Sequence, residues 1–175
     1  MNRRFLLFAG VAGAALVATT VLRRMGVQTD ARAETFEITK TDAEWRAILT
    51  DAQFKVLRQE DTEYPGTSPL LEEHRKGTFH CAGCDLPLYS SETKFESGTG
   101  WPSFWDALPN AIGKHEDTSL MMVRTECHCR HCGGHLGRIF DDGPPPTGMR
   151  HCINGVSLTL KPASARPRRL PPSPF

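Results

Sequence analysis

Two cysteine pairs near the middle of the chain have the spacing of metal ligands. Cys81 and Cys84 form one CxxC unit, and Cys129 and Cys132 form a second. Each unit can present two thiolates from one tight turn, so the two units together complete the tetrahedral ligand set of Zn²⁺. Four thiolates leave no open position for water or substrate. We therefore expect one structural Zn²⁺ per chain, joining two segments with 44 residues between them.

Two other interpretations of these pairs stay open at the level of sequence. The cysteines could form two disulfides or a redox-active CxxC, and export from the cytosol would favour disulfides. Paired CxxC units on strand turns are nevertheless the usual zinc signature. Four more residues that could be mistaken for ligands lie beside the pairs, and we expect them to be neighbours of the metal only: His80, Cys127, His128 and His131.

The remaining cysteine, Cys152, stands alone in the stretch RHCINGV near the end of the chain. A lone cysteine on a strand is more often a small buried apolar residue than a nucleophile. Its neighbours favour chemistry, because Arg150 lies two residues before it, on the same face of a strand, and can lower the pKa of the thiol. Asn154 lies two residues after it and can donate a hydrogen bond to a bound oxygen.

Short strands must position most of these side chains. Gly and Pro recur too often for long helices, and the runs TFHC, LPLYS, SLMMVRTE, GRIF and GVSLTLK are β-branched or aromatic and bounded by turn residues. The body of the chain is therefore predicted to be mainly antiparallel β-structure.

Two short amphipathic helices are predicted ahead of these strands. Thr41 precedes Glu44 by three residues, and Thr50 precedes Gln53 by three, which is the spacing of a capping box. Apolar residues follow at helical spacing in both segments and should face the core: Trp45, Ile48, Leu49, Phe54 and Leu57.

The first 33 residues have the pattern of an export signal. Arg3 and Arg4 resemble the start of a twin-arginine signal, an uncharged run follows, and residues 31–33 form a small-x-small cleavage site. An uncleaved anchor is the alternative, because residues 5–22 span 18 positions and a membrane helix needs about 20. Both interpretations place the rest of the chain in the bacterial periplasm, free or attached to the inner membrane.

Length and charge favour one globular domain over residues 34–161. The chain has 175 residues and a net charge of +1, which falls to about −3 without the first 33 residues because these hold five arginines and one aspartate. An acidic domain argues against nucleic acid as a partner.

Residues 162–175 are proline-rich and basic without periodicity, so we expect a disordered tail. We expect the protein to be a monomer.

Two long motifs resemble the B-type peptide methionine sulfoxide reductases, which act on the R epimer of methionine sulfoxide. They are KGTFHCAGCDLPLYSSETKFESGTGWPSFW and GGHLGRIFDDGPPPTGMRHCINGVSL, and the resemblance covers roughly residues 36–161. It implies a fold of two antiparallel β-sheets with short N-terminal helices, and a structural zinc remote from the active site. It also implies Cys152 as the nucleophile and oxidised proteins or peptides as substrates.

The residues around Cys152 suit that chemistry. A thiolate attacks the sulfoxide sulfur, the oxide needs a proton as its bond breaks, and the cysteine becomes a sulfenic acid. His135 is the expected acid, because an imidazole has a pKa of about 6.5, and Asn154 is expected to bind the oxide. The resemblance makes Trp101 the apolar wall for the substrate methyl group, and we expect Phe104 as a second wall.

Three positions depart from the pattern of that family. Most members have HLGH where residues 135–138 read HLGR, and Arg138 cannot donate its proton, although it can stabilise charge on the oxide. His151 replaces an aromatic residue and by strand alternation should face away from Cys152. Thr99 stands where many members have a resolving cysteine, so the sulfenic acid should be reduced by an external reductant, either a thioredoxin-like protein or a small thiol.

Two other functions remain to be distinguished from catalysis. A zinc-clamped β module could bind a peptide without turnover, an alternative that Arg138 in place of histidine leaves open. A zinc-ribbon protein that binds nucleic acid is disfavoured by the acidic domain and by the export signal.

Overall fold

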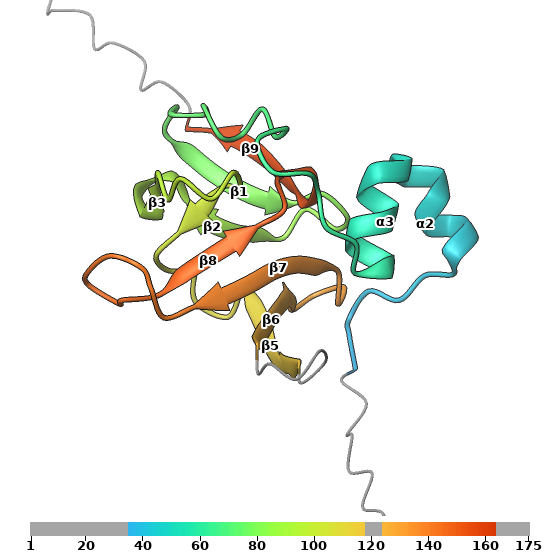
Figure 1. Ribbon diagram of the computed structural model, residues 1–175. Helices are drawn as coiled ribbons and strands as arrows, with labels where there is room; N and C mark the ends of the chain where they lie inside the picture. The colour runs from blue at the N-terminus through green and yellow to red at the C-terminus, as the bar shows by residue number, and fades with distance from the viewer. Residues whose placement is uncertain (1–34, 118–123, 164–175) are drawn as a thin grey trace, which may run out of the picture. The chain divides into compact units, whose positions relative to one another are not determined.

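The structure is a computed structural model that describes residues 35–117 and 124–163 (Figure 1). The predicted export signal at 1–33, its apolar segment and residues 164–175 of the predicted tail lie outside the described residues. Within the described ranges, no helix is long and apolar enough to cross a membrane.

Two helices, α2 (Asp42–Ile48) and α3 (Asp51–Gln59), lie together at one end of the sheets in Figure 1. Both predicted capping boxes are present. The apolar faces are buried as predicted, with one exception. Ile48 is 57 % exposed, because α2 ends at this residue and the following Leu49, which is 8 % exposed, takes the buried position instead.

The predicted fold class, mainly β with two antiparallel sheets, is confirmed. The sheet order is β2-β1-β9 in one sheet and β3-β4-β8-β7-β6-β5 in the other, and each pair of neighbouring strands is antiparallel. The strands are β1 (Gly77–Cys81), β2 (Pro87–Ser90), β3 (Lys94–Phe95), β4 (Ser103–Phe104), β5 (Ile112–Asp117), β6 (Arg124–Cys129), β7 (His135–Phe140), β8 (Arg150–Ile153) and β9 (Leu158–Pro162). Two 3₁₀ turns, η1 (Ser91–Thr93) and η3 (Gly155–Ser157), follow β2 and precede β9.

The bounds of β6 and β9 differ from those of the predicted segments. The run SLMMVRTE is seen as strand only from Arg124, because residues 118–123 lie outside the described residues. At the other end, β9 continues to Pro162, one residue beyond the predicted end of the domain, and the Ala163 N–H donates to the Lys76 carbonyl oxygen at 2.8 Å.

An aromatic cluster joins the two sheets. Tyr89 of β2 stacks on Phe104 of β4 with ring centroids 4.4 Å apart, and Phe79 of β1 contacts the same ring edge-on at 5.0 Å. All three side chains are fully buried. Offset and edge-on pairs of this kind add about 0.5–1.5 kcal/mol each beyond the area they bury. The inner face of β4 and β8 is therefore occupied by core, and chemistry must use the outer face.

The register of the larger sheet sets which side chains share that outer face. Cys152 on β8 pairs with Ser103 on β4 and with Arg138 on β7, and Arg138 pairs in turn with Glu126 on β6. Directly opposed residues of antiparallel strands lie on the same face, about 4.5–5.5 Å apart at Cβ. A row of polar side chains thus crosses the sheet through Cys152.

Candidate active site and metal centre

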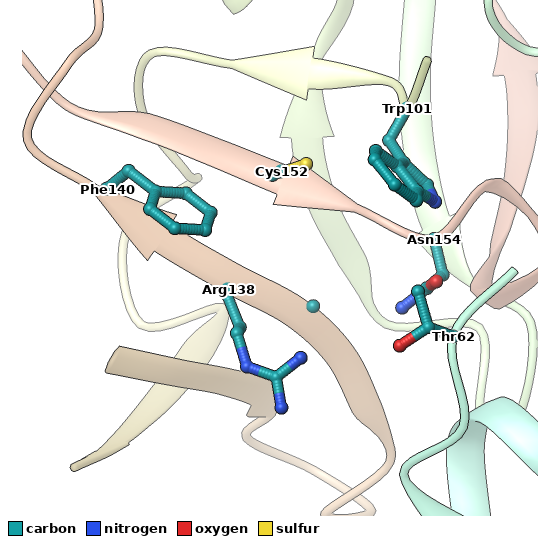
Figure 2. A pocket seen from close by; sticks show the side chains of 7 residues that line it. Thr62, Trp101, Arg138, Phe140, Cys152 and Asn154 are labelled. Atoms are coloured by element: carbon teal, nitrogen blue, oxygen red, sulfur yellow. The ribbon is translucent and has the colours of Figure 1, made fainter. Parts of the chain in front are cut away.

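Cys152 lies in a small pocket on the outer face of the larger sheet. The pocket has a volume of about 130 Å³, which is well below the roughly 300 Å³ of the smallest sites for drug-sized ligands. Figure 2 shows Trp101 and Phe140 on either side of Cys152, with Arg138 and Asn154 around the same space. The lining residues are Thr62, Trp101, Gly137, Arg138, Phe140, Cys152 and Asn154. The pocket can therefore take the end of one side chain.

Gly137, one of the residues that line the pocket, lets β7 approach β8 closely. A Cβ atom at this position would lie 2.1 Å from the carbonyl oxygen of Cys152, and its φ of 158° is unusual for other residues. Any larger residue would push the two strands apart. Because Arg138 faces Cys152 across the same pair of strands, such a residue would also displace the cation from the thiol.

Opposing effects act on the thiol of Cys152. Burial raises its pKa, while a hydrogen bond with Thr99, whose Oγ1 lies 3.9 Å from Sγ, and the positive charge of Arg150 lower it, and burial prevails. Arg150 is not a free cation, since its Nε and Nη2 donate to the two carboxylate oxygens of Asp142 at 2.8 Å each. The predicted effect of Arg150 on the thiol has the expected direction, but it is smaller than the effect of burial.

His135 lies beside the pocket and does not line it. Its Nδ1 is 2.8 Å from Oε1 of Glu126, the other carboxylate oxygen of Glu126 is 2.9 Å from Nδ1 of His128, and His135 is 2 % exposed. Burial raises the pKa of Glu126, but the two histidine hydrogen bonds outweigh it and hold the pKa at about 2. A carboxylate at Nδ1 requires a proton there, so His135 can donate from Nε2 only as an imidazolium.

Asn154 is held by two backbone groups. Its Nδ2 donates to the Leu136 carbonyl oxygen at 3.0 Å, and its Oδ1 accepts from the Glu63 N–H at 2.9 Å. A primary amide has two N–H groups, so one remains for a ligand in the pocket that Asn154 lines. The amide is thus fixed before any substrate binds.

Glu63, in the loop after α3, also holds Trp101. Its carbonyl oxygen accepts from the indole Nε1–H of Trp101 at 2.9 Å. Its carboxylate Oε2 accepts from the backbone N–H groups of Gly155 and Val156, at 2.6 and 3.3 Å. One residue therefore braces both the aromatic wall and the amide of the pocket.

Phe104, predicted as a second wall of the pocket, is not there. Its side chain is fully buried and pairs in register with His151, on the face opposite Cys152. Phe140 lines the pocket instead. His151 faces the core, as strand alternation predicts, with Nδ1 3.2 Å from the Tyr89 hydroxyl, and burial lowers its pKa to about 4.

Sequence reasoning missed the supporting residues of the site. Phe140 could have been found, because it lies two positions after Arg138 on one strand and so shares its face. Glu126, Thr62 and Glu63 could not have been found from the sequence. Glu126 reaches the site only through the pairing of β6 with β7, and the other two lie in a loop without periodicity.

The two CxxC units come together as predicted. The sulfur atoms of Cys81, Cys84, Cys129 and Cys132 all lie within 4.8 Å of one another. The Cys81–Cys132 and Cys84–Cys129 sulfur distances are 3.8 and 3.4 Å, and all the cysteines are free. A tetrahedral ion with metal–sulfur bonds of about 2.3 Å has sulfur–sulfur edges of about 3.8 Å. The cluster therefore fits a four-coordinate metal ion.

Comparison with known proteins agrees with this geometry. The SelR domain family model matches residues 49–162. A protein of Agrobacterium fabrum named "Peptide methionine sulfoxide reductase MsrB" is 50 % identical over 127 residues, which are 72 % of this chain and 94 % of that protein. Proteins of the same name from Thiobacillus denitrificans and Pseudomonas putida are 51 % and 52 % identical, over 70 % and 72 % of this chain and 94 % and 96 % of their own lengths.

The Glu63 brace gives a stability prediction. Replacing Glu63 by Ala removes a charged acceptor from two backbone N–H groups, so the free energy of unfolding should fall by about 1–3 kcal/mol. Urea denaturation of the two proteins measures this. Glu72→Ala is the matched control, since its side chain is 90 % exposed, and it should change stability by less than about 0.5 kcal/mol. Equal losses in the two variants would contradict the brace.

Proposed function

Because this chain belongs to the SelR-domain family of B-type peptide methionine sulfoxide reductases, we propose that it reduces the R epimer of methionine sulfoxide in oxidised proteins and peptides to methionine. One observation on this chain supports the proposal most directly. A half-buried thiol, Cys152, lies between two aromatic side chains and opposite a permanent cation, in a pocket that fits one side-chain end.

The pocket offers a different surface to each substituent of the sulfoxide sulfur. Trp101 and Phe140 provide apolar contact for the methyl group, while Arg138 and the remaining N–H of Asn154 attract the oxide. Cys152 then meets the sulfur atom itself. Only one arrangement of methyl and oxygen about the chiral sulfur satisfies these contacts.

The reaction transfers one oxygen atom. The Cys152 thiolate attacks the substrate sulfur and forms a transient S–S bond. The substrate S–O bond breaks as the protonated oxygen bonds to the Cys152 sulfur, and the S–S bond breaks with its electron pair left on the substrate, so the products are methionine and a Cys152 sulfenic acid. The sulfoxide gains two electrons and the thiol loses two. The thiol loses one proton and the sulfenic acid carries one, so the overall step neither consumes nor releases protons. A group in the site is needed only to transfer the proton to the oxide.

Arg138 and His135 have different roles toward the oxide. Arg138 keeps its charge at all relevant pH values and acts electrostatically. His135, whose Nδ1 is held by Glu126 beside the pocket, is the proposed proton donor. Arg150 supports the thiolate from its position two residues before Cys152, where Asp142 orients it.

The cluster of four cysteines is proposed to hold one structural Zn²⁺. When bound, the ion closes the knuckles before β2 and after β6 onto each other and supplies folding energy. Cys129 lies on β6, and β7 separates that strand from β8, which carries Cys152. The residues of the pocket act without the ion.

We propose that the protein works outside the cytoplasm as a periplasmic monomer. The support is the pattern of residues 1–33, with a twin-arginine start, an apolar run and a cleavage site. If residues 5–22 are retained they form an inner-membrane anchor, and residues 34–161 are the catalytic domain in both cases.

An external thiol is proposed to regenerate Cys152. Cys127, a free thiol outside the four-cysteine cluster, is fully buried and pairs with Gly137, which places it on the face opposite Cys152. A disulfide requires Cβ atoms about 3.5–4.5 Å apart that point toward each other. Thr99 occupies the position of the resolving cysteine of many relatives. A thioredoxin-like protein or a small thiol must therefore reduce the sulfenic acid.

Epimer selectivity tests the proposed function. With dithiothreitol as reductant, the purified protein should reduce peptidyl R-methionine sulfoxide at least about 100-fold faster than the S epimer, because the S epimer exchanges methyl and oxide in the pocket. Initial rates with the separated epimers measure this. Similar rates for both would reject the pocket assignment, and binding of the R epimer without turnover would favour a peptide-binding module.

Metal analysis tests the zinc proposal. Protein made with ample metal should contain one Zn²⁺ per chain, and Cys81→Ser or Cys129→Ser should lose the ion and much of the stability. Cys127→Ser is the control, because Cys127 lies next to the cluster and outside it. Protein without zinc but with intact 81–84 and 129–132 disulfides would contradict the proposal.

Product mapping tests the route of regeneration. Cys127→Ser should keep nearly full activity and Cys152→Ser should keep none. After one equivalent of substrate and a thiol quench, mass spectrometry should find an oxidised Cys152 without an internal disulfide. A dominant Cys127–Cys152 disulfide would show that the sheet opens during turnover.

A further inference from the structure

Three hydroxyl groups form a chain that ends at the thiol of Cys152. The Oγ1 of Thr99 lies 3.9 Å from the Cys152 Sγ and 2.8 Å from the Oγ of Ser97. The Ser97 Oγ lies 2.7 Å from the Oγ of Ser103, which donates to the carbonyl oxygen of Trp101 at 3.1 Å. The chain thus runs from the nucleophile to a backbone acceptor.

Backbone contacts fix the loop that carries Thr99. Gly100 has φ of 89°, and a Cβ atom there would lie 2.8 Å from the Cβ of Pro65. Its carbonyl oxygen accepts from the Gly66 N–H at 2.8 Å. Ser103 is 1 % exposed and directly opposite Cys152 in the β4–β8 pair. The hydroxyl chain is therefore held by backbone contacts at both ends.

Counting protons shows that the chain has two orientations. Each hydroxyl has one proton. When Cys152 is a thiol, it can donate a hydrogen bond to Thr99, which donates to Ser97, which donates to Ser103. Ser103 then donates the last hydrogen bond to the Trp101 carbonyl oxygen. When Cys152 is a thiolate it can only accept, so each hydroxyl must turn and donate toward the sulfur.

We propose that Thr99 is a catalytic residue and that Ser97 and Ser103 are positioning residues, which together form a reversible hydroxyl chain that accepts from the Cys152 thiol and donates to its thiolate. The hydroxyls reverse by rotation and keep their own protons, while the proton that Cys152 loses passes to the oxide of the substrate and ends on the sulfenic acid. After oxygen transfer the same Thr99 hydroxyl can bind the sulfenic acid, a part of the proposal that rests on the proposed function.

Charged groups reach Cys152 from β7 and from its own strand, and the hydroxyl chain complements them. Arg138 faces it from β7, and Arg150 lies on β8 with Asp142 bound. Burial raises the pKa of Cys152, and among the groups that oppose this, Thr99 has the largest effect. Neither arginine can accept a hydrogen bond from the thiol, whereas a hydroxyl can both accept one and donate one.

Alkylation of Cys152 without substrate tests the proposal. Thr99→Val removes the hydroxyl and keeps the side-chain shape, so the thiolate loses a donor. The rate of reaction of Cys152 with iodoacetamide at pH 8 should fall about threefold to tenfold, with the pH midpoint of the rate shifted upward by about 0.5–1 unit. The zinc-loaded full chain is used, and the peptide that contains Cys152 is quantified by mass spectrometry.

Three further variants separate the reversible hydroxyl chain from a purely structural contact. Thr99→Ser should restore the wild-type profile, and Ser97→Ala should shift the midpoint in the same direction as Thr99→Val, by a smaller amount. Thr159→Val is the matched control, because Thr159 is exposed on β9 of the other sheet, and it should leave the profile unchanged.

A wild-type profile in both Thr99→Val and Ser97→Ala would overturn the proposal. If Thr99→Val does not fold, Ser97→Ala decides the same question. Because alkylation requires no turnover, a shifted profile in a protein without reductase activity would support the hydroxyl chain while rejecting the proposed function.

Discussion

The antiparallel register of β8 between β4 and β7 is the constraint on which the rest of the site depends. It sets Cys152 opposite Ser103 on one side and Arg138 on the other, and it turns the neighbouring His151 into the core. A shift by one residue would exchange the two faces and bury the thiol behind Tyr89 and Phe104. The aromatic cluster that locks the two sheets together is therefore also what holds the nucleophile on the accessible face.

Local patterns were sufficient to predict the parts of the structure that depend on one segment. Both capping boxes, the CxxC knuckles and the alternation of residues along β8 follow from spacing alone. The error at Ile48 is of the same local kind, because a helix that ends one residue earlier or later exposes a different side chain. These predictions needed no knowledge of which strand lies beside which.

Contacts between distant segments were beyond sequence reasoning. Phe104 and Phe140 are both aromatic residues at the end of a strand. Alternation after Arg138 places Phe140 on the pocket face, whereas only the pairing of β4 with β8 shows that Phe104 faces away from the pocket. The roles of Glu63 and Glu126 arise in the same way. Glu63 is hydrogen-bonded to Asn154 and Gly155, which follow it by 91 or more positions in the sequence. Glu126 is hydrogen-bonded to His135 across the pair of β6 and β7, which contains a bulge. No composition or period signals such contacts.

The arginine at position 138 changes how the site must handle protons. A guanidinium opposite the thiol stabilises negative charge at every relevant pH but releases no proton. The oxide must therefore be protonated by His135 or by the proton that Cys152 itself gives up, and burial favours a thiol that still carries it. A hydroxyl chain that accepts a hydrogen bond from the thiol and then donates to the thiolate suits this arrangement better than a second fixed charge would. With arginine in place of histidine at position 138, the site therefore depends more on the hydroxyl groups of Ser97 and Thr99, on the other side of Cys152.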